Sequence, residues 1–169
     1  AEFAATASRA KLENWLWLAG MVLTGIWMLT GNCRQKRKIK ALPDSRDATL
    51  LAELEAVKAL AGVDDKVRIC IKEGAETTFL TRMRGQYVIA LESGFDAAER
   101  RQVLLHELTH LKHGDLGGNQ SAALILAICW WNPVIWLAFR RFRRDMEIYC
   151  DYDAARLSGD KKAYAATLV

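Results

Sequence analysis

One stretch without a charged side chain, residues 15–32, constrains the fold of this chain most. It contains three tryptophans, and as a helix it would be roughly 27 Å long, close to the hydrocarbon thickness of a bilayer. A basic segment follows it, as is typical of the cytoplasmic end of a membrane span. We predict a transmembrane helix over residues 15–33 and a basic juxtamembrane linker over residues 34–43. A buried core helix or a signal sequence is the alternative, although a signal peptide carries its basic residues before the apolar run.

A second uncharged run, residues 120–139, is also long enough to cross a membrane, and the basic residues 140–144 follow it directly. Because basic clusters follow both runs, both ends of the second run are predicted to be cytoplasmic. Asn132 and Pro133 lie near its middle, and proline interrupts the helical hydrogen-bond ladder. We therefore predict that this run turns back, as a hairpin or as two short helices that dip into the membrane or lie in its interface.

The composition fits a membrane-anchored protein with one soluble domain. The chain has 169 residues, of which 51% are hydrophobic, and a net charge of +4. The basic clusters indicate a lipid bilayer as the acidic partner, and because no motif for contacting bases accompanies them, nucleic acid is not an expected partner. Four cysteines without C-x-x-C spacing are typical of reduced thiols. Residues 1–14, which do not begin with methionine, are interpreted as a tag or an extracytoplasmic remnant.

Residues 44–169 are predicted to form the soluble domain, which includes the second apolar run. Asp44 or Asp47 can cap a helix that runs to Leu60, and Gly62 would end it. Alternating apolar residues and turn residues predict three short strands, over residues 67–71, 77–82 and 86–91. The predicted fold class is α+β, with a small antiparallel sheet packed on the helix that follows.

That helix has clear end signals and carries an H-E-x-x-H pattern. Asp96 and Glu99 form a capping box, and Gly114 would end the helix. Two histidines, His106 and His110, lie one turn apart on one face, so both can reach one metal ion. Between them lies Glu107, whose carboxylate can take a proton from a metal-bound water.

A later helical segment, which begins at residue 140, carries two acids one turn apart. Glu147 can be a third metal ligand, and Asp151 can hold the far nitrogen of a ligating histidine. The residues alone leave open that both are solvated acids beside arginines. A single membrane crossing by residues 120–139 would separate His106 from Glu147, so a shared metal also requires the predicted turn.

Three blocks of sequence resemble the BlaR/MecR-type antirepressor metallopeptidases, the integral-membrane sensor-transducers of β-lactam resistance in bacteria. The blocks are residues 106–115 (H-E-L-T-H-L-K-H-G-D), 131–137 (W-N-P-V-I-W-L) and 145–151 (D-M-E-I-Y-C-D). One difference is that residues 84–91 lack the prolines that the family carries before its zinc helix, although the strand pattern is retained.

The resemblance implies a gluzincin-type site that holds one Zn²⁺ ion. The ligands would be His106, His110 and Glu147, with Glu107 as the general base and Asp151 holding a ligand. The resemblance also implies an endopeptidase in the bacterial inner membrane that faces the cytoplasm and cleaves a transcriptional repressor, itself or both. The expected partners are this protein substrate, the bilayer and, as an open alternative, a second copy of the chain.

Two other functions remain as alternatives. An HtpX-like membrane quality-control metalloprotease shares the H-E-x-x-H and Glu-x-x-x-Asp patterns, although the tryptophans around Asn132-Pro133 argue against it. A non-catalytic, membrane-anchored interaction module would use zinc only structurally. Structural sites normally have four protein ligands, and three strong ligands favour a catalytic site. Candidates for stabilising an oxyanion are His113, Tyr149 and Tyr152.

Overall fold

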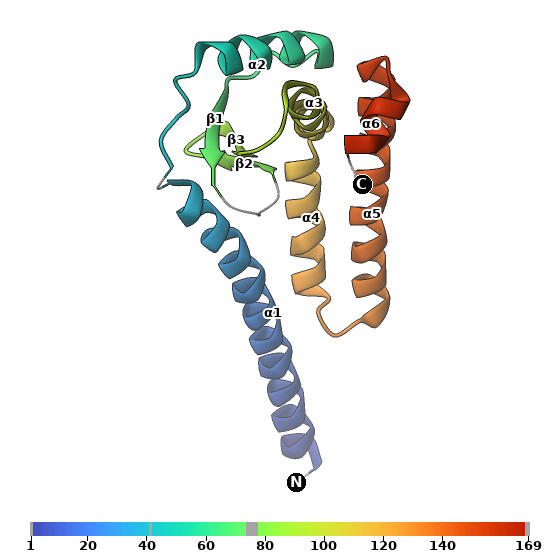
Figure 1. Ribbon diagram of the computed structural model, residues 1–169. Coiled ribbons are helices and arrows are strands. Elements are labelled where there is room, and N and C mark those ends of the chain that lie inside the picture. The colour runs from blue at the N-terminus through green and yellow to red at the C-terminus, as the bar shows by residue number, and fades with distance from the viewer. Residues whose placement is uncertain (1, 41, 74–77, 168–169) are drawn as a thin grey trace.

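A computed structural model describes residues 2–40, 42–73 and 78–167. A body made of a small sheet and several helices lies at one end of the molecule, and the other helices extend from it in the same general direction (Figure 1). The architecture is α+β, as predicted.

The first extension is α1 (Glu2–Lys40), and its part Lys11–Lys40 is long and apolar enough to cross a membrane by length and composition. Large apolar side chains along it are exposed, among them Trp15 at 68% and Leu23 at 67%. The basic residues 34–40, predicted to belong to a linker, continue the same helix. Near its end, Ile39 is buried against the sheet, which attaches α1 to the body.

Helix α2 (Ala48–Ala61) begins and ends where the sequence predicts. The Asp47 carboxylate accepts hydrogen bonds from the backbone N–H groups of residues 49 and 50, which fixes the start. Gly62 ends the helix with a φ of 73°, in the left-handed region that favours glycine. The buried side chains of Leu54 and Val57 belong to the main core, which α2 covers.

The sheet consists of β1 (Val67–Lys72), β2 (Phe79–Met83) and β3 (Gln86–Glu92), in the order β1-β3-β2. It is mixed, so the prediction of an antiparallel sheet is wrong: β1 pairs with β3 in parallel, and only β2 and β3 are antiparallel. The chain reverses between β1 and β2 and again at Arg84-Gly85, so β3 runs parallel to β1. The most buried strand, β3, takes the centre. Thr77, predicted to begin the second strand, lies outside the described residues.

Helix α3 (Ala97–His113) carries the H-E-x-x-H pattern. The predicted capping box is present, because Asp96 accepts from the Glu99 backbone N–H and Glu99 accepts from the Asp96 backbone N–H. Leu104 and Leu108 are fully buried in the main core with residues of α2 and of the sheet. The sheet therefore packs on this helix, as predicted.

The second apolar run forms a hairpin of α4 (Asp115–Ile128) and α5 (Pro133–Ser158), followed by α6 (Lys161–Thr167). The Asn132 side chain accepts a hydrogen bond of 2.9 Å from the Val134 backbone N–H, and Pro133 takes the first helical position. The turn therefore lies at Asn132-Pro133, as predicted. The second helix of the pair is longer than expected, because α5 continues without a break through Glu147.

The tip of this hairpin packs on α1. Trp130 donates an indole hydrogen bond of 3.1 Å to the Trp17 carbonyl, and its ring lies so close to Gly20 that a Cβ there would be 2.1 Å from the ring. Only glycine permits this approach. Further along the two helices, the rings of Trp27 and Trp136 lie 6.3 Å apart between centroids. These contacts fix the position of the hairpin along the axis of α1.

Candidate metal centre

The structure brings His106 and His110 of α3 together with Glu147 of α5. The Nε2 atoms of the two histidines are 3.1 Å apart, and the Glu147 Oε2 atom lies 3.7 Å from His106 Nε2 and 3.4 Å from His110 Nε2. One ligand atom from each residue lies within 4.8 Å of the others, a spacing that allows a shared metal ion. The hairpin makes this possible, because it returns the chain to α3.

The electrostatics of this cluster favour a bound cation. Burial opposes a charge on His110, but its hydrogen bonds with Cys150 and with the accepting carboxylates of Glu147 and Asp115 outweigh it and raise the pKa of His110 to about 11. Hydrogen bonds from His106 and His110 hold the pKa of Glu147 well below its usual range. Two imidazoles and a carboxylate form a donor set of the kind that holds zinc with a fourth position open. The residues present therefore fit a zinc ion.

The far nitrogen of His106 is held by two partners. His106 Nδ1 lies 3.0 Å from Asp151 Oδ1 and 3.0 Å from the Tyr164 hydroxyl oxygen. Tyr164, on α6, also donates to Asp151 at 3.1 Å, and burial raises the pKa of its hydroxyl, so that it remains protonated. A proton held at Nδ1 leaves the lone pair of Nε2 free for a metal. Asp151 is thus where the sequence predicted it; Tyr164 was not predicted.

The far nitrogen of His110 has a different pair of partners. His110 Nδ1 lies 2.7 Å from Asp115 Oδ2 and 3.0 Å from Cys150 Sγ, and the thiol donates to the same carboxylate at 3.2 Å. Cys150 is fully buried, and burial raises the pKa of its thiol to about 11. Sequence analysis missed both residues. Asp115 and Cys150 both lie in the blocks that carry the family resemblance, but no role was assigned to either residue.

Glu107 is buried, with 7% of its surface exposed, and lies between α3 and the sheet. Burial raises the pKa of its carboxyl, while the nearby His106 and His110 and a hydrogen bond from the Leu80 backbone N–H act in the opposite direction. Leu80 belongs to β2, an edge strand of the sheet. The carboxylate therefore faces a free strand edge, beside the two histidines.

The three residues predicted as candidates for stabilising an oxyanion differ in how the structure holds them. His113 Nε2 lies 3.2 Å from Asp153 Oδ2, and its ring lies 4.7 Å from the Tyr149 ring. Tyr149 and Tyr152 are exposed at 59% and 64%. The structure thus holds His113 between Asp153 and the Tyr149 ring, and it leaves the two tyrosines largely exposed.

Two comparisons with known proteins relate this chain to a family. The family model described as BlaR1 peptidase M56 matches residues 3–169. The regulatory protein BlaR1 of Bacillus licheniformis is 27% identical over 151 residues, which cover 88% of this chain and 25% of that protein. The chain thus spans about a quarter of the length of this relative. Together with the histidine and glutamate cluster on α3 and α5, the match shows that the chain belongs to the BlaR1 peptidase M56 family of metallopeptidases.

Proposed function

We propose that this chain is the catalytic part of a membrane-bound zinc endopeptidase that cleaves a transcriptional repressor, itself or both, in response to β-lactams. The observation that carries the proposal is the convergence of His106, His110 and Glu147, with the far nitrogen of each histidine held by a carboxylate. The name of the relative, a regulatory protein, supports the signalling role.

Each residue has a definite task in this proposal. His106, His110 and Glu147 hold the ion, and Asp151 and Asp115 orient the imidazoles. When bound, zinc would polarise the scissile carbonyl and acidify a water molecule. The Glu107 carboxylate would accept a proton from the attacking water and pass it to the leaving amine, and burial raises the pKa of its carboxyl.

The edge strand β2 offers a place for an extended substrate. Its Leu80 backbone N–H already donates to Glu107, so the edge of β2 and the proposed base lie next to each other. A peptide that adds to this edge as a further strand would carry its backbone past the metal centre. Backbone pairing of this kind selects an extended segment more than a particular sequence.

We further propose that α1 spans the inner membrane, that the tip of the hairpin dips into it, and that the body faces the cytoplasm. The exposed apolar side chains of α1 and of the hairpin support this, because water would be a poor solvent for them. Examples on the hairpin are Leu124 at 63%, Trp131 at 62% and Val134 at 66%.

The test is cleavage of a purified β-lactam-resistance repressor by the full chain in lipid nanodiscs, with zinc content measured on the same samples. Glu107→Ala should abolish cleavage and keep the zinc, while Glu73→Ala, at an exposed site, should change neither. Cleavage that persists in Glu107→Ala contradicts the mechanism. Zinc that is absent, or that survives His110→Ala, supports the interaction module. Cleavage of an unfolded membrane protein in preference to the repressor supports the quality-control alternative.

A further inference from the structure

The arginines that follow the two apolar runs lie at one level of the molecule. The ring contact between Trp27 and Trp136 relates α1 to α5, and both helices run from it towards the body (Figure 1). Arg34 follows Trp27 by seven residues and Arg143 follows Trp136 by seven, so each lies about 10 Å along its helix from the contact. Two basic clusters more than a hundred residues apart in sequence therefore reach the same height.

We call the arginines at this height the basic collar. By the same rise per residue they lie within about 5 Å of one level. All of them are exposed to solvent in the structure. The collar consists of Arg34, Arg37, Arg140, Arg141, Arg143 and Arg144.

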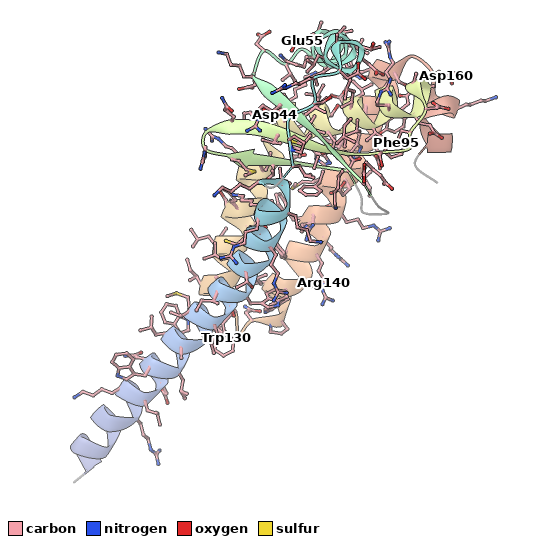
Figure 2. The ribbon with its side chains drawn as sticks, turned by 60° about the vertical axis from the view of Figure 1, so that its left-hand side comes forward. Asp44, Glu55, Phe95, Trp130, Arg140 and Asp160 are labelled. Atoms are coloured by element: carbon pink, nitrogen blue, oxygen red, sulfur yellow. The ribbon has the colours of Figure 1, made fainter. Side chains whose placement is uncertain are left out.

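The surface changes character below the collar, on the side of the hairpin tip. The sequence holds no charged residue between Glu13 and Arg34, or between Asp115 and Arg140. Figure 2 shows Trp130 near the tip beside α1 and Arg140 nearer to the body. An open hollow of about 350 Å³ lies on this apolar side, lined by Leu23, Thr24, Trp27 and Trp136. The basic collar thus lies next to an apolar surface with a hollow in it.

We propose that the basic collar binds the headgroups of anionic phospholipids, and that the hollow receives part of an acyl chain. This rests on the membrane attachment proposed above. Guanidinium groups match phosphate oxygens in geometry and charge. A headgroup with net negative charge is attracted to six cations, whereas the amine of a zwitterionic headgroup offsets the attraction. The occupant that fits both the charge and the apolar surface is therefore an anionic lipid.

The distribution of tryptophan provides a direct test. All six tryptophans lie in α1 or in the hairpin around its tip, so quenching of their fluorescence by brominated lipids reports on this region alone. The full chain is reconstituted in vesicles that contain brominated phosphatidylglycerol or brominated phosphatidylcholine, and the relative affinity is obtained from the two quenching curves. We expect a preference for phosphatidylglycerol of about threefold or more at low salt, which falls at high salt.

Three variants separate charge from folding. Replacing the four α5 arginines by glutamine leaves Arg34 and Arg37 in place and should therefore reduce the preference to below about twofold, whereas replacing them by lysine should retain most of it. The matched control replaces four exposed cations of the body, Arg46, Lys66, Arg101 and Lys162, by glutamine and should keep the preference. Quenching without a lipid preference, or a preference that survives the glutamine variant, overturns the collar and leaves the membrane attachment standing. No quenching by either brominated lipid overturns the attachment and the collar together.

Discussion

The two histidines of the metal centre are held in the same way by partners from different parts of the molecule. His106 is held by Asp151 and Tyr164, which follow Glu147 in the chain. His110 is held by Asp115, at the corner between α3 and α4, and by Cys150 of α5. The support of His106 is thus built by the segment that follows Glu147, whereas the support of His110 combines the corner after α3 with a thiol of α5. The centre depends on the packing of α4, α5 and α6 against α3.

The largest effect is expected when both carboxylates are replaced. A carboxylate that holds a zinc-bound histidine contributes about 10- to 100-fold to metal affinity. Because Asp115 and Asp151 contact different histidines, their free-energy contributions should nearly add. Asp115→Asn with Asp151→Asn should therefore weaken zinc binding more than either single variant does, by up to about 10,000-fold, measured by competition with a chromophoric chelator. A double variant that binds zinc as tightly as the weaker single variant would show that the two supports act as one.

The single variants should differ from each other. Asp115→Asn is expected to weaken zinc binding by about 10- to 100-fold, and Asp151→Asn by less. The reason is exposure, because the Asp115 side chain is 15% exposed and that of Asp151 is 43% exposed. An equal or reversed order in the chelator assay would contradict this ranking.

The hydroxyl of Tyr164 should have a smaller effect. Tyr164→Phe removes one group that contacts both His106 and Asp151, which corresponds to about 1 kcal/mol or about fivefold in zinc affinity. Tyr152→Phe, at a side chain that is 64% exposed, is the matched control and should have no effect. The same loss of zinc affinity in both variants would mean that the contact between the Tyr164 hydroxyl and His106 does not contribute to zinc binding.

The smallest effect is expected for Cys150→Ser. Serine can still donate to Asp115 and fills nearly the same volume, so zinc affinity should fall by less than about threefold. His110, Asp115 and Cys150 also lie close enough together to hold a metal themselves. A cobalt-substituted sample distinguishes the two arrangements: a sulfur-to-cobalt charge-transfer band that disappears in Cys150→Ser would show that the thiol is a ligand.

Local signals in the sequence predicted much of the fold. Asp47, Asp96 and Asn132 each begin a helix because a side-chain oxygen accepts from the first backbone N–H groups, and this depends only on near neighbours. The parallel pairing of β1 with β3 could not be predicted in this way. It depends on which strand takes the buried centre, and that is decided by packing against α3.

The candidate site divides along the same line. Helical periodicity places His106 and His110 together, and it places Asp151 one turn after Glu147, but only the family resemblance singled out this glutamate and aspartate from other acids. Their roles as ligands and support remain predictions. The sequence did not predict the roles of Asp115 and Cys150, because their contacts form where α3, α4 and α5 meet and no spacing within one helix indicates such a junction. Tyr164 was not predicted either, because its contact with His106 depends on how α6 packs against α3.

The unbroken course of α5 has a mechanical consequence. Glu147 lies fourteen residues after Pro133, about 21 Å from the tip along a rod without a hinge. A tilt of only about 5° about the tip would move Glu147 by nearly 2 Å, several times the tolerance of about 0.5 Å for a working metal site. A small change in the tilt of the hairpin relative to α1 would therefore produce a large change in the distance between the Glu147 carboxylate and the imidazoles of His106 and His110.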